Sequence, residues 1–389
     1  MESINIGKIL KKYTMVIALI AVAIFFNYKT NGSILLPQNI TLLISQNAYV
    51  FVLAAGMLLC ILTGGNIDLA CGSVLCFLGG IGAVIMDKKI NMWVAVIVML
   101  IGGILVGVWQ GFWIAYMKVP PFIATLAGMY AFRGVSSLVL NGQVVTVENT
   151  AYLNIFGGGD MCYIPDFNAA TKLNETCLIA GILIAVIYTA MVIRNRILAS
   201  AKGYSINPLY SDIIKTIVID AAIIWVAYKL ASDRGIPTVL IWITLVLLIY
   251  EYVTTKTTIG RYLYAVGGNE KATRLSGIDP RKVYMFAYVN MGLMSGLAGI
   301  IHIARMVGAQ PTFGQGYEMD AIAACFIGGA SAYGGEGKVF GMVIGALLMG
   351  IINLGMFIMG VDSEYQKVVK GLVLLFAIIF DVLSNKKKN

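Results

Sequence analysis

The sequence predicts an all-α, polytopic helical membrane protein with about 10–12 transmembrane helices, some of them broken or re-entrant. Of its 389 residues, 59% are hydrophobic and only 12% are charged, whereas soluble domains carry about 25% charged residues. Apolar runs of roughly 18 or more residues recur along the chain, and each could cross a bilayer core of about 30 Å. The 43 glycines fit the same class, because small residues let transmembrane helices pack closely.

Twelve apolar segments are candidate spans, and no soluble domain interrupts them. The segments 67–87 and 319–333 are short or broken by glycine, so we expect them to be re-entrant or half-helical. The chain is therefore predicted to form one transmembrane domain over residues 1–389, with a solvated outer loop at 141–175 and an inner loop at 254–282. The candidate spans are 13–30, 40–62, 67–87, 92–116, 121–140, 176–193, 216–231, 236–253, 283–307, 319–333, 338–359 and 366–383.

The charges of the loops predict the orientation of the chain. Loop 254–282 contains six basic and two acidic residues, whereas loop 141–175 contains four acidic residues and one basic residue. Basic loops remain on the cytoplasmic side of the membrane. Both termini, including the tail "NKKKN", are thus expected on the cytoplasmic side of the membrane. The outer loop "DKKIN" at 87–91 departs from this pattern.

Composition also excludes several classes of function. The net charge of +9 reflects basic cytoplasmic loops rather than nucleic-acid binding. The six cysteines contain no CxxC pair and are interpreted as small hydrophobic residues. Cys162 and Cys177 share the outer loop, which allows a disulfide between them.

No catalytic, metal or cofactor site is predicted. The only histidine, His302, lies in an apolar span and is interpreted as a hydrogen-bonded packing residue rather than a proton relay. The stretch "GGEGK" is not a phosphate loop, because Ala332 replaces the first glycine of that motif and Val339 replaces its hydroxyl residue.

Residues 264–282, "YAVGGNEKATRLSGIDPRK", predict a short helix in the inner loop. Asn269 is a suitable N-cap, Glu270 favours the first turn, and Gly277 and Pro280 end the helix. A helix of about two turns is unstable alone in water, so it must pack against something.

Ala272, Leu275 and Ile278 recur at threes and predict its packing side, while Lys271 and Arg274 reach outward. The segment is either an amphipathic helix on lipid headgroups or a projection that binds a partner subunit. The pair Gly267–Gly268 and the glycine after the helix would fix the angle of such a projection, which favours the partner.

Four motifs in this order resemble permeases of ATP-binding-cassette (ABC) sugar importers. They are "GRYLYAVGGNEKATRLSGID" at 260–279, "TGGNIDLACGS" at 63–73, "VPPFIATLAGMYAFRG" at 119–134 and "CFIGGASAYGGEGKVFGMVIGALLMG" at 325–350. The likeness is to the bacterial monosaccharide family that includes the ribose, galactose and xylose permeases, and it extends over nearly the whole chain. The chain length and the stretch 194–235 look most like the xylose or multiple-monosaccharide branch.

This resemblance implies a pore formed with a second permease copy, as a homodimer, in the lipid membrane. It also implies a cytoplasmic ABC ATPase subunit and a periplasmic or lipid-anchored sugar-binding protein. The short helix would dock into the ATPase and transmit its closure to the spans. The ATPase-coupling residues that the resemblance assigns are Gly267, Gly268, Asn269, Glu270, Ala272, Arg274, Leu275, Gly277 and Ile278.

Polar residues inside the spans are candidates for the translocation path. Asp68 is predicted as the only deep carboxylate, and it either lines the path or caps a broken helix. Glu318 and Asp320 are expected near span ends, where charge is tolerated. Neutral amides suit hydroxyl-rich substrates, although each could instead bond a neighbouring helix. With Asp68, the path candidates are Gln46, Asn47, Asn66, Asn290 and Asn353.

Glycines spaced at fours predict close helix contacts. Gly103, Gly107 and Gly111 form one such stripe, and Gly337, Gly341 and Gly345 form another. Backbones can touch along these stripes.

Three classes of function are compatible with a chain of this composition. The first is the permease subunit of an ABC importer for a pentose or hexose such as xylose, galactose or glucose, with nucleosides or another small polar metabolite as the alternative cargo. The second is an ion-coupled secondary transporter, which would favour clustered carboxylates and inverted repeats. The third is an intramembrane enzyme, for which the sequence offers no metal-ligand pair and no base beside a serine.

Overall fold

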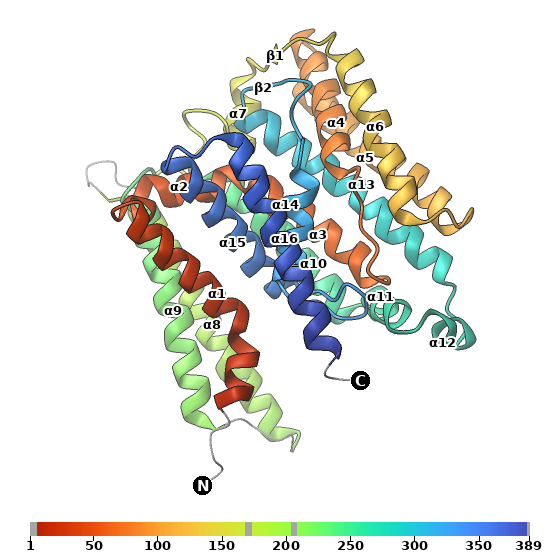
Figure 1. The fold of residues 1–389 in the computed structure, drawn as a ribbon. Helices are drawn as coiled ribbons and strands as arrows, with labels where there is room; N and C mark the ends of the chain where they lie inside the picture. Colours follow the sequence, from red (N-terminus) through yellow and green to blue (C-terminus); the bar gives the residue numbers. More distant parts are fainter. Residues whose placement is uncertain (1–5, 168–172, 204–207, 387–389) are drawn as a thin grey trace.

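Every one of the twelve predicted spans coincides with one or more helices of the computed structural model, which describes residues 6–167, 173–203 and 208–386 (Figure 1). The segment 168–172 of the outer loop and the end of the basic tail, 387–389, lie outside the described residues. The helices are α1 (Ile6–Lys29), α2 (Pro37–Gln46), α3 (Ala48–Leu62), α4 (Cys71–Asp87), α5 (Met92–Ala115), α6 (Pro121–Val139), α7 (Thr150–Phe156), α8 (Glu175–Ala201), α9 (Leu209–Ala231), α10 (Thr238–Lys256), α11 (Thr258–Gly268), α12 (Glu270–Leu275), α13 (Pro280–Arg305), α14 (Tyr317–Ile327), α15 (Val339–Ile358) and α16 (Ser363–Lys386).

The bundle is organised around α3. All fifteen residues of this helix are buried, and it packs against α10, α13, α14 and α15. Its sequence, "AYVFVLAAGMLLCIL", is apolar on every side, and a helix of that kind is stable only where protein or lipid surrounds it completely.

The predicted span 40–62 is bent. Helices α2 and α3 meet at an angle of 42° with a break at Asn47. The Asn47 side chain donates a hydrogen bond to the Leu43 carbonyl at 2.8 Å, which satisfies its amide at the break. Gln46 and Asn47 are therefore held at a corner inside the bundle rather than along a straight helix.

Glycine brings α5 and α13 into backbone contact, as the first predicted stripe requires. A Cβ added at Gly107 would lie 2.6 Å from the Tyr288 carbonyl oxygen, and one at Gly292 would meet the Gly103 carbonyl. The second stripe is confirmed only in part. Gly341 and Gly345 pack against the end of α14, but Gly337 lies in the turn before α15.

The outer loop is not a plain solvated loop, so that prediction is wrong. It contains α7 and the strand β1 (Val145–Thr146), which pairs antiparallel with β2 (Gly308–Ala309). Tyr152 and Phe156 are buried, and the Tyr152 hydroxyl donates to the Ile300 carbonyl at 2.8 Å. The apolar residues of this short helix pack on α13 and α10, and their removal from water stabilises the helix in this position.

Fewer helices than predicted meet the requirements of a simple span. In the described residues, six helices are long and apolar enough, or seven if the bent α2–α3 pair counts as one. Others are short, because α4 has 17 residues and α14 has 11, and α9 carries Asp212, Lys215 and Asp220 within its length. The polytopic helical class is confirmed, with short and broken elements where glycine predicted them.

The two ends of the bundle differ. Figure 1 shows α12 and both chain ends toward one end, and α7, β1 and β2 at the other. This arrangement agrees with the predicted grouping of the termini with loop 254–282, while the side of the membrane stays a prediction from charge.

The suggested disulfide is not formed. Cys162 and Cys177 are both free and buried. The Cys177 thiol lies between α8 and α9, where it donates to the Ala227 carbonyl at 3.3 Å, so it has a partner other than Cys162.

Candidate functional site

The predicted short helix exists and is capped as expected. Asn269 is the N-cap of α12, and its side-chain oxygen accepts a hydrogen bond from the Ala272 amide at 3.0 Å. Gly277 has φ +85°, a backbone conformation that glycine adopts without strain. Asp279 then caps α13 by accepting from the Arg281 amide at 3.1 Å. The segment thus leaves α11, turns twice and enters α13 with its backbone fixed.

The packing side of α12 differs from the prediction. Thr273 is the buried residue, and its hydroxyl is 2.8 Å from both the Ala265 and Asn269 carbonyls. Ala272 is exposed, and Leu275 is 89% exposed, although both were expected on the packing side. A helix of six residues lying on the end of α11 has only one face covered. It therefore presents an apolar residue, Leu275, to whatever lies beyond the bundle.

Gly267 and Gly268, which were predicted to fix the angle of the projection, have different surroundings. They are the last two residues of α11. A Cβ at Gly267 would collide with the Leu62 carbonyl and the Gly335 amide, whereas Gly268 has nothing within 4 Å. Gly267 is needed for close packing of α11 on the end of α3.

Helix α11 joins the projecting segment to the core. Leu263 and Val266 are buried, and the Tyr264 hydroxyl donates to the Gly337 carbonyl at 2.7 Å. The same turn is held to the end of α3 by a hydrogen bond from the Gly335 amide to the Leu62 carbonyl at 3.0 Å. These contacts connect the segment that carries α12, through α11, to the end of the central helix α3.

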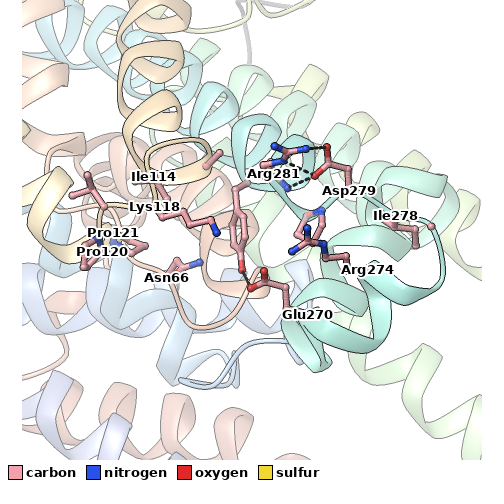
Figure 2. Close-up of a pocket in the computed structure, with 15 residues that line it drawn as sticks. Asn66, Ile114, Lys118, Pro120, Pro121, Glu270, Arg274, Ile278, Asp279 and Arg281 are labelled. Carbon is pink, nitrogen blue, oxygen red and sulfur yellow. Dashed lines mark hydrogen bonds and ion pairs between the residues drawn. The ribbon is translucent and has the colours of Figure 1, made fainter.

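A hollow of about 620 Å³ lies beside α12, and we call it the docking cleft (Figure 2). One wall is formed by α12 and the start of α13, and the opposite wall by the turn 116–121 between α5 and α6. Asn66, from the turn between α3 and α4, also lines it. Residues far apart in the sequence therefore meet around one opening.

The charges of the docking cleft are only partly paired. The Tyr284 hydroxyl donates to Glu270 at 2.9 Å, and Arg281 forms an ion pair with Asp279 at 3.1 Å. The hydrogen bond from Arg281 holds the pKa of Asp279 below its usual value. Lys118 and Arg274 have no carboxylate partner among the residues that the structure describes.

Lys118 and Tyr284 were not predicted from the sequence, because neither lies in the coupling segment. Figure 2 shows Lys118 and Arg274 directed into the space between the two walls. The double proline that closely follows Lys118 is the only local signal that the turn 116–121 is rigid.

Three of the path candidates meet in a second hollow of about 270 Å³, which we call the amide chamber. Gln46, Asn47 and Asn353 line it. Its wall also has aromatic residues that the sequence did not indicate. Tyr49 and Tyr317 stack with ring centroids 4.0 Å apart, and the predicted packing residue His302 lies 3.3 Å from the Tyr317 hydroxyl.

The other three path candidates lie elsewhere. Asn66 lines the docking cleft. Asp68 is buried and accepts a hydrogen bond from the Ala70 amide at 2.7 Å, which supports its capping role at the break before α4. Asn290 is bonded to the Tyr250 hydroxyl and to the Phe286 carbonyl. The structure does not align the six candidates along one route.

Asp68 is not the only buried carboxylate, so the prediction of a single interior carboxylate is wrong. Glu318 and Asp320 lie in the first turn of α14, near a span end as predicted, and are nevertheless 5% and 0% exposed. Asp320 accepts from the Tyr49 hydroxyl at 2.8 Å and pairs with Lys370 at 3.0 Å. Asp220, which is half-buried on α9, accepts a hydrogen bond from the Thr189 hydroxyl at 2.6 Å. The partners that make this burial tolerable come from other spans.

The chain matches a known protein family along most of its length. The model of the family described as "branched-chain amino acid transport system / permease component" matches residues 11–160 and 167–378. The chain belongs to this family.

Two kinds of relative agree with this assignment. The xylose transport system permease protein of Escherichia coli is 36% identical, covering 97% of this chain and 93% of its own. The corresponding protein of Haemophilus influenzae is 35% identical and covers 100% of this chain and 99% of its own. The ribose import permease protein of E. coli is 35% identical and covers 90% of this chain and 87% of its own. No solved structure is significantly similar to the chain.

Membership of the family identifies the chain as a multi-pass membrane permease, a component of a transport system. Among the described residues no group of three histidine, cysteine or acidic side chains could hold a metal ion. The docking cleft and the amide chamber are therefore best considered as sites of a transporter component.

Proposed function

We propose that the chain is the membrane permease subunit of an ATP-driven monosaccharide importer. The names of its relatives support this cargo, because they are permeases for xylose and for ribose at 35–36% identity over most of the chain. The observation that carries the mechanism is α12, a capped helix that exposes Leu275 beside a cleft with two unpaired cations. A pore that generated its own driving force would have no need of such a projection.

The partner at α12 is a cytoplasmic ABC ATPase subunit. Docking would bury Leu275 in an apolar pocket of the ATPase, and an acidic side chain of the ATPase would enter the docking cleft between Lys118 and Arg274. Desolvated charge pairs and buried apolar anchors dominate binding energy at such interfaces. Closure of the ATPase would then move α12, and α11 would carry that movement to the end of α3.

The cargo arrives at the opposite end of the bundle. A periplasmic or lipid-anchored sugar-binding protein would deliver it there, and a second copy of the permease would complete the pore as a homodimer. This arrangement implies cytoplasmic termini in a bacterial inner membrane, with Gln46, Asn47 and Asn353 near the entry side and Asn66 near the exit.

Co-purification with the ATPase tests the docking assignment. Arg274→Glu and Leu275→Asp should each reduce ATPase recovery on the tagged permease at least tenfold, because each places a carboxylate in the contact. Lys202→Glu is a matched control, since Lys202 is an exposed cation at the end of α8 and does not line the cleft. Unchanged recovery with both variants would reject α12 as the docking site.

Transport by the reconstituted components tests the function itself. Proteoliposomes with the permease, the ATPase and the binding protein should accumulate xylose or ribose only when ATP is inside. The buried carboxylates Asp320 and Glu318 and the half-buried Asp220 give an ion-coupled mechanism one supporting observation. Sugar uptake by the permease alone, driven by a proton or sodium gradient, would establish that mechanism and reject the importer. Uptake of a nucleoside or of leucine in place of sugar would replace the cargo class.

A further inference from the structure

The amide chamber has a neighbour at the same end of the bundle. This neighbour is a hollow of about 380 Å³, which we call the outer recess. It lies between α2, the 157–163 segment and the loop before α10 at Asp233–Arg234. The two hollows share Ser45 and Arg305 as wall residues. Because they share these wall residues, the two hollows are adjoining parts of one polar indentation.

One wall of the amide chamber is aromatic. Tyr49 and Tyr317 stack with an interplanar angle of 23°, and His302 meets Tyr317 edge-on at 5.1 Å. Tyr49 is held from behind by its hydrogen bond to Asp320. Aromatic rings fixed in this way provide a rigid apolar surface beside polar groups. The C–H face of a sugar ring can pack on such a surface.

Two residues that line the chamber each have a buried polar atom without a partner in the described part of the chain. These atoms are the donor Nε of Arg305 and the acceptor Oδ1 of Asn353, which have opposite hydrogen-bonding sense. A buried group left unpaired costs about 1–3 kcal/mol. A hydroxyl both donates and accepts, so neighbouring hydroxyls of one ligand could satisfy both atoms.

The charges at the two hollows balance once the partner of Lys370 is counted. Three cations, Arg234, Arg305 and Lys370, and two carboxylates, Asp160 and Asp233, line the hollows. Lys370 is paired with a third carboxylate, Asp320, which does not line either hollow. A charged ligand would therefore upset the balance, while an uncharged ligand would not.

We propose that the amide chamber is a transient binding site for an uncharged cyclic polyol, with the sugar ring against Tyr317 and its hydroxyls bonded to Arg305 and Asn353. This inference rests on the proposed function and assigns the contact residues within the permease. The chamber volume of about 270 Å³ lies just below the range of roughly 300–1,000 Å³ found for pockets that bind drug-sized ligands. A monosaccharide is smaller than such ligands, so this volume suits it. Few polar contacts make the site weak, and weak binding lets the cargo leave.

Saturation-transfer NMR of the full-length permease in nanodiscs tests the site without the binding protein, with millimolar D-xylose and D-ribose as probes and D-glucuronate, a cyclic polyol with a carboxylate, as the charged comparison. Transfer to the ring protons of the two uncharged sugars is expected, with none to glucuronate. Asn353→Leu should weaken the sugar affinity roughly threefold to tenfold, the effect of one hydrogen bond. Asn290→Leu is the matched control, because Asn290 is bonded within the bundle and does not line the chamber.

Equal sugar binding by wild type and Asn353→Leu would overturn the site, as would an equal loss in Asn290→Leu. If Asn353→Leu does not elute as a monodisperse protein, Tyr317→Ala takes its place, with Tyr317→Phe as the control that keeps the ring. Uptake by the complete wild-type complex is measured in parallel. Sugar uptake that no chamber variant slows would reject the chamber and leave the importer standing, whereas no uptake of either sugar would reject the importer function itself.

Discussion

Replacing Lys370 with methionine should destabilise the protein more than any surface charge change, because it leaves a carboxylate buried without its cation. The Asp320 side chain is 0% exposed, and its two partners in the described residues are the Tyr49 hydroxyl and Lys370, which is itself 23% exposed. Removing one partner of a buried ion pair costs about 3–5 kcal/mol. Because Tyr49 still donates and water reaches the Lys370 position, the lower end, about 3 kcal/mol, is expected.

The free energy of unfolding of the purified permease, followed during SDS titration of detergent micelles, measures this change. Lys367→Met is the control on the same helix, since its pair with Glu364 is exposed on both sides and solvent-exposed pairs contribute little to stability. Asp320→Asn combined with Lys370→Met removes both charges and should recover most of the loss. If Lys370→Met is no less stable than Lys367→Met, the buried pair does not hold α14 to α16 and the reasoning fails.

Three glycine substitutions test the packing, and a labelling experiment tests the cysteines. Gly292→Val should lower the yield of folded protein and cost about 3 kcal/mol, because its side chain would enter the α5 backbone; normal thermal stability would contradict the α5–α13 contact. Gly267→Ala should lower the free energy of unfolding by about 1–3 kcal/mol in the same SDS titration. Gly268→Ala should be neutral, because a Cβ at Gly268 would have no atom within 4 Å. Equal effects of the two substitutions would show that α11 does not lie against Leu62. Cys162 and Cys177 should both react with maleimide after denaturation without reductant, since both are free, and protection of the pair until reductant is added would reveal a disulfide.

The spans could be predicted because their signal is local. A continuous apolar run determines a membrane helix without reference to the remainder of the fold, and every predicted run coincides with a helix. The caps of α12 were equally local, since Asn269 and Gly277 act on their own neighbours.

What could not be predicted depends on contacts between distant segments. The close packing of Gly267 depends on the Leu62 carbonyl, which lies about two hundred residues earlier in the chain, so the sequence around the glycine pair could not predict this contact. The burial of Asp320 depends on Lys370 from the last helix. The break at Asn47 has neither proline nor glycine to mark it. The amide chamber is assembled from several helices, and only its amides stood out in the sequence.

The turn between α3 and α4 connects the docking cleft directly to the core of the bundle. Asn66 lines the docking cleft, and Asp68, two positions later, caps the interrupted helix in the core. A spectroscopic label at residue 66 would thus report occupancy from the aqueous side and rearrangement of the membrane interior with one signal. Because only two positions separate these residues, an ATPase bound at the cleft would need no long chain of side-chain contacts to affect the membrane-spanning interior.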